Sequence, residues 1–351
     1  MLEELQVAMR ESRALAQRDD DPQRPSRVWT ETEVVDGTPR KALVVILRTR
    51  GCTWAIKGGC TMCGYVNDSF VKKIAADDLV AQFRHALTQF DGHEVIKLYT
   101  SGSFLDKTEV PIEAQQGIVD LVPPGLVRFQ SEAQAHHVTA ERLADLRARL
   151  PAATQLCFGI GLESGSDDVL EYSVNNEFTF ADFERACGVA AAHGTTLKAY
   201  VLVKPLFLTE SEAIEECVET ARRVHALAGV EAVSFNPISI HANTLTEQVW
   251  QRRQYRPPWL WSIVEVLRQV TPFSRVHVKS DVVAGGLERG AHNCGRCDDA
   301  VLRAIDAHKV TQDVGVFDGL DCPCRAEWEE LREMERFLWC AGAPPRLEVL
   351  R

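Results

Sequence analysis

The sequence has no uninterrupted apolar run long enough to span a membrane, which argues against a membrane-embedded protein. Its charged N-terminus lacks an apolar signal core with a cleavage site. Positive charge is in deficit, because 39 Lys and Arg residues stand against 50 Asp and Glu residues, for a formal net charge of −11. Such an acidic chain is poorly suited to bind nucleic acid over its whole surface. We therefore expect a soluble, cytoplasmic protein.

Cysteine, by contrast, is abundant, with 11 among the 351 residues. A reducing compartment argues against a disulfide framework, and two tight cysteine groups indicate bound metal. The isolated cysteines fit buried, unligated positions; they are Cys157, Cys187, Cys217 and Cys340. Hydrophobic residues make up 45% of the chain, enough for one large domain or for one domain with a small appendage.

Short apolar runs alternate with helical patterns between residues 41 and 240. The predicted strands cover Ala42–Leu47, Val95–Tyr99, Leu126–Phe129, Gln155–Ile160, Thr196–Val203 and Ala232–Phe235. Six strands separated by helices indicate right-handed βαβ units and a parallel sheet, either open and doubly wound or barrel-like. In both architectures, functional residues gather at the carboxyl ends of the strands.

The two ends of the chain follow other patterns. Residues 1–40 resemble a polar, partly helical arm. The alternation stops near residue 240, and we expect residues 241–351 to form a C-terminal module. In this module a further strand is predicted at His277–Lys279 and a last helix at Glu327–Trp339.

The C-terminal module begins with a basic stretch. Residues 251–296 hold eight Arg and Lys residues against three acidic ones. Together with Tyr255, Trp259 and Trp261, these charges are suited to contact RNA phosphates and bases. The alternative for the tryptophans is packing, which the apolar spacing of Trp259–Val270 favours.

The first cysteine group is Cys52, Cys60 and Cys63, a C-x7-C-x2-C spacing directly after the first predicted strand. Three thiolates suit a [4Fe–4S] cluster with one iron left without a protein ligand. S-adenosylmethionine (SAM) can bind that iron and be cleaved to a 5′-deoxyadenosyl radical. The alternative is a structural zinc site, but such sites take four protein ligands, and the nearest candidate, His85, falls on the next helix.

The second group, Cys294, Cys297, Cys322 and Cys324, has the pattern C-x2-C followed by C-x-C. Four thiolates match a closed tetrahedral zinc site, which would stabilise a small module with little core. A second iron–sulfur cluster is the rival interpretation, and His292 is an alternative ligand.

Beyond the spacing, the chain resembles radical SAM enzymes with a long cluster loop, such as the group that includes the catalytic subunit of elongator. The resemblance covers residues 43–328 and is closest to the radical SAM subunit of archaeosine synthase (RaSEA). It is carried by RGCTWAIKGGCTMCGY, KLYTSGSFLD, GLESGSDDVLEYSV, YVLVKPLFLTESEAIEE, NPISIHANTLTE, YRPPWLWSIVEVL and RGAHNCGRCDDAVLRAI. It implies a partial (β/α)6 barrel with a small C-terminal metal-binding module.

The resemblance assigns cofactor-binding roles at the second and third strand ends. It implies that the backbone of Ser101, Gly102 and Ser103 contacts the amino group of SAM. Glu132 matches the motif after the third strand, in which Gln134 stands where relatives carry arginine. The nearby His136 and His137 are interpreted as surface residues before a helix that begins with Thr139 as its N-cap.

Later strand ends are assigned in the same way. The resemblance implies that Glu163, followed by Ser164, binds ribose hydroxyls or an amine. It implies that Lys204 binds a carboxylate or a phosphate. The run Asn175-Asn176-Glu177 replaces what reads N-K-G in relatives.

The implied activity is archaeosine synthesis with a [4Fe–4S] cluster and SAM. The adenosyl radical would abstract hydrogen from the lysine carbon beside the linking nitrogen of a lysine-modified 7-deazaguanine in tRNA. Cleavage of the C–N bond would leave archaeosine. The family also implies a partner subunit that attaches the lysine, and the cluster requires an electron donor.

Two alternatives remain open from the sequence. One is a divergent radical SAM enzyme that acts on another RNA base or on a small molecule, which fits the acidic composition. The other is a non-catalytic, zinc-stabilised RNA-binding module. That module would be colourless when purified under anaerobic conditions, whereas an iron–sulfur enzyme would be brown.

Overall fold

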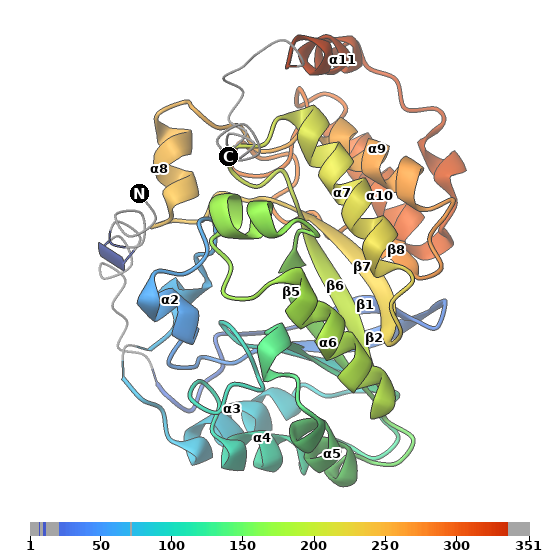
Figure 1. The fold of residues 1–351 in the computed structure, drawn as a ribbon. Helices are drawn as coiled ribbons and strands as arrows, with labels where there is room; N and C mark the ends of the chain where they lie inside the picture. Colours follow the sequence, from blue (N-terminus) through green and yellow to red (C-terminus); the bar gives the residue numbers. More distant parts are fainter. Residues whose placement is uncertain (1–6, 8–9, 12–20, 71, 336–351) are drawn as a thin grey trace. The chain divides into compact units, whose positions relative to one another are not determined.

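The computed structural model describes residues 7, 10–11, 21–70 and 72–335 of the chain. Within this part, eight strands follow one another in a single sheet in the order β1 to β8 (Figure 1). The chain divides into two units. The first comprises the described residues up to 59 together with 63–161 and 181–198, and the second comprises 60–62, 162–180 and the residues from 199 on.

The sheet of the first unit is a hairpin followed by parallel strands. β1 (Arg27–Val35) pairs antiparallel with β2 (Thr38–Ile46). β2 pairs in parallel with β3 (Val95–Tyr99), β3 with β4 (Arg128–Ala133), and β4 with β5 (Gln155–Glu163). Since parallel strands end at the same edge of a sheet, the loops that follow β2, β3 and β4 share one edge.

Amphipathic helices connect these strands. α3 (Ala76–Leu87), α4 (Ile112–Val119) and α5 (Ala140–Arg149) lie in a row (Figure 1). Leu79 and Phe83 of α3 are fully buried, as expected for residues four apart on one helix face. The first unit also contains most of α6 (Phe180–Ala192), and the short elements α2 (Thr53–Lys57), η1 (Tyr65–Asp68) and η2 (Ala135–His137).

The second unit contains the end of β5, most of β6 (Thr195–Val203), β7 (Val230–Pro237) and β8 (His277–Lys279). β7 pairs in parallel with β8. The helices of this unit are α7 (Glu210–Val224), α8 (Leu245–Gln251), α9 (Leu260–Val270), α10 (Asp298–Thr311) and α11 (Cys324–Glu335), with a π-helix, η3 (Val169–Val174), and a 3₁₀ turn, η4 (Val314–Phe317).

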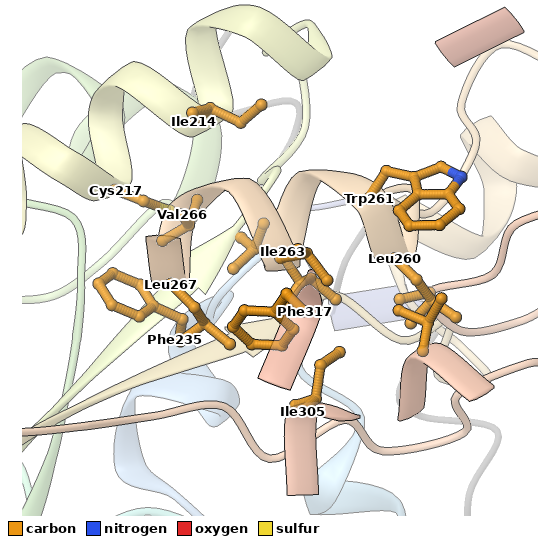
Figure 2. Close-up of a cluster of buried hydrophobic side chains, with 14 of the residues drawn as sticks. Ile214, Cys217, Phe235, Leu260, Trp261, Ile263, Val266, Leu267, Ile305 and Phe317 are labelled. Atoms are coloured by element: carbon orange, nitrogen blue, oxygen red, sulfur yellow. The ribbon is translucent and has the colours of Figure 1, made fainter. Parts of the chain in front are cut away.

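Helix α9 lies at the centre of the core of the second unit (Figure 2). Leu260, Ile263 and Leu267 follow helical spacing and are fully buried. Side chains of α7, β7, α10 and η4 pack around them; these include Ile214, Cys217, Phe235, Ile305 and Phe317. Trp261 is buried in the same core, so the packing interpretation of this tryptophan is confirmed.

A buried ion network lies within the first unit. The Glu33 carboxylate contacts Nζ of Lys97 and Nζ of Lys198, each at 2.7 Å. Lys97 also contacts Glu31 at 2.6 Å. Glu33 and both lysines are almost fully buried, so removing one charge leaves the others in a medium that solvates them poorly.

The predicted α/β fold class with a C-terminal four-cysteine group is confirmed. The strand predicted at His277–Lys279 is present as β8. The last helix occupies Cys324–Glu335, and residues 336–339 of its predicted range lie outside the described residues. Among the described helices, none has the length and apolarity that crossing a bilayer requires. The boundary near residue 240 stays a prediction.

Two parts of the chain differ in detail from the expectation. The end of the expected polar arm forms β1, whose Glu33 points to buried lysines rather than to water. The strand predicted at Leu126–Phe129 is β4 at Arg128–Ala133. Its Gln130 and Ser131 are polar but fully buried. The strand is therefore not an apolar run, and hydrophobic patterning did not predict its full extent.

The buried network gives a prediction on stability. Glu33→Gln should lower the free energy of unfolding by about 3–5 kcal/mol, because it removes the carboxylate between two buried ammonium groups. Urea denaturation followed by circular dichroism measures the loss. Asp120→Asn, which breaks the exposed ion pair with Arg149, is the control and should cost less than about 1 kcal/mol. Equal losses in the two variants would contradict the prediction.

Candidate active site

The cysteine loop starts directly after β2. Cys52 precedes α2 and is buried. Burial, followed by the nearby charges of Glu109 and Cys63, raises the pKa of the Cys52 thiol to about 12. A thiol in such surroundings becomes a thiolate at neutral pH only when a cation binds it. The environment of Cys52 is therefore that of a metal ligand rather than of a free nucleophile.

The loop that follows β3 lies against this cysteine. A Cβ atom built on Gly102 would lie 2.7 Å from Cβ of Cys52 and 2.9 Å from its Sγ. Real Cβ atoms do not approach so closely, so only glycine fits here. The structure thus brings Gly102, which the resemblance assigned to SAM, into direct contact with Cys52.

A buried carboxylate holds the Ser101–Ser103 backbone in place. Oε1 of Glu109 accepts hydrogen bonds from Oγ1 of Thr49 at 2.7 Å, from N of Ser101 at 2.9 Å and from N of Gly102 at 3.2 Å. Its Oε2 accepts one from N of Ser103 at 2.8 Å. Burial raises the pKa of Glu109, while the hydrogen bonds act in the opposite direction. Sequence reasoning missed Glu109, which lies just beyond the resembling stretch KLYTSGSFLD.

Further hydrogen bonds tie the same two loops together. Oγ1 of Thr53, the residue after Cys52, donates to Oδ2 of Asp106 at 2.9 Å. Burial opposes ionisation of Asp106, but hydrogen bonds from Thr108 and Thr53 outweigh it and lower the pKa. The hydroxyls of Ser69 and Ser101 lie 2.6 Å apart. The loop after β3 therefore supports the cysteine loop near both of its ends.

The end of β4 meets the same loop. O of Glu132 accepts a hydrogen bond from N of Phe104 at 2.9 Å, and Nε2 of Gln134 lies 4.0 Å from Sγ of Cys52. Nδ1 of His137 lies 3.0 Å from Oγ of Ser103. The structure thus gives His137 a partner in the loop, whereas the sequence suggested a surface residue.

In the second unit, hydrogen bonds hold Thr61, which lies between Cys60 and Cys63. Thr61 donates from N to O of Val174 at 2.9 Å and from Oγ1 to O of Ser173 at 2.7 Å. O of Thr61 accepts from N and Oγ1 of Thr246 at 3.2 and 3.1 Å. The preceding Cys60 packs against a small core that contains Val174. Neither threonine was singled out from the sequence.

Two strand ends of the second unit carry non-glycine residues in the left-handed region. Glu163 has φ of 68° and Lys204 has φ of 60°. Such conformations are costly for residues with a Cβ and concentrate at functional sites. Burial raises the pKa of Glu163 to about 7. Among the described residues, none forms a hydrogen bond or ion pair with the Glu163 carboxylate.

The neighbouring candidates are already engaged. Nζ of Lys204 contacts Oε1 of Glu210 at 2.6 Å and O of Arg256 at 3.1 Å. Oγ of Ser164 donates to Glu216 and accepts from N of Ser166. Of the candidates in this unit, Glu163 therefore has the side chain best placed to accept a ligand.

The second cysteine group is compact. The four sulfurs of Cys294, Cys297, Cys322 and Cys324 lie within 4.8 Å of one another. Sγ of Cys294 lies 4.0 Å from Sγ of Cys297 and 3.6 Å from Sγ of Cys322, and the sulfurs of Cys297 and Cys324 are 3.7 Å apart. Tetrahedral zinc with Zn–S bonds of about 2.3 Å requires sulfur separations of about 3.8 Å. The group therefore fits a single tetrahedral ion.

Burial raises the pKa of the Cys297 and Cys324 thiols, and polar groups around the four sulfurs act in the opposite direction. The backbone N–H of Arg296 is the main cause that lowers the pKa of Cys294 to about 6. Nε1 of Trp261 donates to Sγ of Cys324, and Nδ2 of Asn293 donates to Sγ of Cys297, both at 3.4 Å. The alternative ligand His292 instead places its Nδ1 2.8 Å from O of Gly290.

Comparison with known proteins gives clear relatives. No protein-family model matches the chain. Archaeosine synthase subunit beta of Methanosarcina acetivorans is 36% identical over 326 residues, which cover 91% of this chain and 92% of the relative. Archaeosine synthase subunit beta of Thermococcus kodakarensis is 34% identical over 319 residues, covering 89% and 98%. Among solved structures, queuine lyase from Clostridium spiroforme bound to SAM and queuine aligns with a TM-score of 0.44 at 17% identity, covering 62% of this chain and 83% of that one.

The relatives confirm the resemblance predicted from the motifs. Identity of about one third extends over nearly the full length of both chains in each pair. This protein belongs to the archaeosine synthase subunit beta family.

Proposed function

We propose that this protein is a radical SAM enzyme of tRNA modification. It cleaves the lysine C–N bond of a lysine-modified 7-deazaguanine in tRNA and leaves archaeosine. Membership in the archaeosine synthase subunit beta family supports the substrate class. The observation that carries the chemistry is the contact between the Ser101–Ser103 loop and the first cysteine, with Gly102 packed against Cys52.

Cys52, Cys60 and Cys63 would hold a [4Fe–4S] cluster. The residues fit this role, because one loop supplies three thiols and Cys52 has the buried surroundings of a metal ligand. With SAM bound, the cluster supplies a 5′-deoxyadenosyl radical. The protein's part is to position these groups and exclude water. Burial of Cys52 and the close packing of Gly102 contribute to both the positioning and the exclusion of water.

The other strand ends would position SAM and the substrate. The backbone of Ser101–Ser103, held by Glu109, would contact the amino group of SAM, with Glu132 beside it. Glu163, followed by Ser164, would accept hydrogen bonds from ribose hydroxyls or from an amine. Lys204 would bind a carboxylate or a phosphate while it remains paired with Glu210.

Recognition of tRNA would involve the basic stretch of the second unit. Arg252, Arg253 and Arg275 are exposed in that stretch and can meet phosphates. Lys279, by contrast, is buried and paired with Asp281 at 2.8 Å, so it is not part of a basic surface. A partner subunit would attach the lysine beforehand, in keeping with the subunit naming of the relatives, and an electron donor would reduce the cluster.

The four-cysteine group would hold zinc. A [4Fe–4S] cube attaches each cysteine to a different iron and so holds its ligand sulfurs farther apart than one ion does. The separations of 3.6 to 4.0 Å fit the single ion. Since Trp261 is in the core and donates to Cys324, the ion would join the module to α9.

The direct test is turnover of modified tRNA. Reconstituted protein is incubated anaerobically with SAM, dithionite and tRNA that carries the lysine-modified 7-deazaguanine, and the digested nucleosides are analysed by mass spectrometry. We expect archaeosine and 5′-deoxyadenosine with wild type and neither with Cys60→Ala. Formation of 5′-deoxyadenosine without any change in the tRNA would contradict archaeosine synthesis and favour another substrate.

A second prediction concerns the pH dependence of SAM binding. With a pKa of about 7, Glu163 is mostly neutral at pH 6 and mostly ionised at pH 8. An ionised acceptor binds hydroxyls or an amine more strongly, so SAM affinity should rise by up to roughly tenfold over this range. Equilibrium dialysis measures it. Glu163→Gln should show a flat profile, and an equal rise in both proteins would refute the role of Glu163.

A third prediction concerns metal content. Wild type should contain one zinc ion per chain in addition to the iron of one cluster, as measured by mass spectrometry of the metals. Cys324→Ser should lose the zinc and unfold at a lower temperature, because a structural site contributes directly to folding. The matched control is Cys217→Ser, a buried cysteine outside the group. Iron and sulfide for two cubes without zinc would overturn the assignment.

A further inference from the structure

The loop between β3 and α4 contains a buried carboxylate, Glu109, to whose charge the proposed function assigns no role. Glu109 is 2% exposed and receives hydrogen bonds from Thr49 and from three successive amides, Ser101, Gly102 and Ser103. These partners come from the two loops that face each other at the strand ends. The Glu109 carboxylate therefore connects Thr49, which precedes the cysteine loop, with the Ser101–Ser103 loop.

The partners of Glu109 indicate its ionised form. Three of the four partners are backbone amides, which can only donate, and they contact both carboxylate oxygens, while the Thr49 hydroxyl lies 2.7 Å from Oε1. The ion pairs of the described residues do not include Glu109. A buried carboxylate without a paired cation is costly, so its charge calls for a reason beyond packing.

The charge lies close to a cluster ligand. The position of a Cβ on Gly102 would be 2.8 Å from Oε2 of Glu109 and 2.9 Å from Sγ of Cys52. The carboxylate oxygen and the sulfur therefore lie within about 6 Å of each other, the range in which like charges interact strongly. Both groups are buried, so water screens this interaction little.

We propose that Glu109 is a positioning residue that holds the Ser101–Ser103 loop against Cys52 and, through its charge, lowers the reduction potential of the cluster. The inference rests on the proposed function, because it requires a cluster on Cys52. Reduction adds one electron from an external donor to the cluster. A fixed negative charge nearby disfavours the reduced state, so the potential falls. A bound cluster at a lower potential would supply its electron to the sulfonium with a greater driving force.

The same carboxylate gives the loop its shape. Glu109 accepts hydrogen bonds from three consecutive N–H groups and so stabilises the backbone conformation that directs them to the same carboxylate. Glutamine at this position would turn an NH₂ group toward N–H donors. It would therefore lose the charge and part of the loop geometry while keeping nearly the same volume.

The test is a redox titration of the reconstituted protein monitored by electron paramagnetic resonance, without SAM and without tRNA. We expect a more positive midpoint potential for Glu109→Gln than for wild type. The matched control is Glu113→Gln, the same change at an exposed position of α4, which should leave the potential unchanged. An unchanged or more negative potential in Glu109→Gln would refute the inference.

A second variant covers loss of the cluster. Should folded Glu109→Gln fail to hold iron, Glu109→Asp, which keeps the charge, should still hold it. Loss of iron from both variants would show that side-chain length and not charge is required, and would contradict the proposal. A wild-type protein without a cluster would refute the proposed function itself. A wild-type cluster with equal potentials in wild type and Glu109→Gln would refute only the role of Glu109.

Discussion

The hydrogen bonds of one buried carboxylate are the constraint on which the candidate active site depends. Glu109 gathers the amides of Ser101–Ser103 and the hydroxyl of Thr49, and so joins the end of β3 to the start of the cysteine loop. Because Gly102 then touches Cys52, any larger residue would push the two loops apart. The arrangement has a thermodynamic cost, since the carboxylate is desolvated without a paired cation.

Within the second unit, Thr61 has its own set of contacts. Thr61 is anchored to the π-helix η3 and to Thr246 at the start of α8. A π-helix widens a helical turn and often occurs at functional sites, where it reshapes the local backbone. In this protein it presents the carbonyl oxygens of Ser173 and Val174 to Thr61. Thr61, which lies between Cys60 and Cys63, therefore has a fixed backbone position.

Motif reasoning was most successful where a residue's chemistry is local. The cysteine groups were recognised from their spacing, and the four C-terminal sulfurs do converge on one point. It was least successful where a residue acts through a distant partner. Glu109 looked like an ordinary loop glutamate, and Glu33 like part of a polar arm, because their partners lie on other segments of the chain. Polar residues inside the sheet, such as the fully buried Gln130, interrupt the apolar run and so made β4 harder to predict from the sequence.

The sequence by itself determined the alternation of strands and helices, the family, and the residues able to bind metal, because these depend on periodicity and on the identity of side chains. The tertiary structure alone decided which loops touch and which charges are buried. Within the first unit, the contact of Gly102 with Cys52 and the four hydrogen bonds of Glu109 arise where strands distant in sequence end at one edge. Within the second unit, the folded backbone sets the left-handed conformations of Glu163 and Lys204. Burial and proximity are properties of the folded chain, and they set the electrostatics on which the chemistry relies.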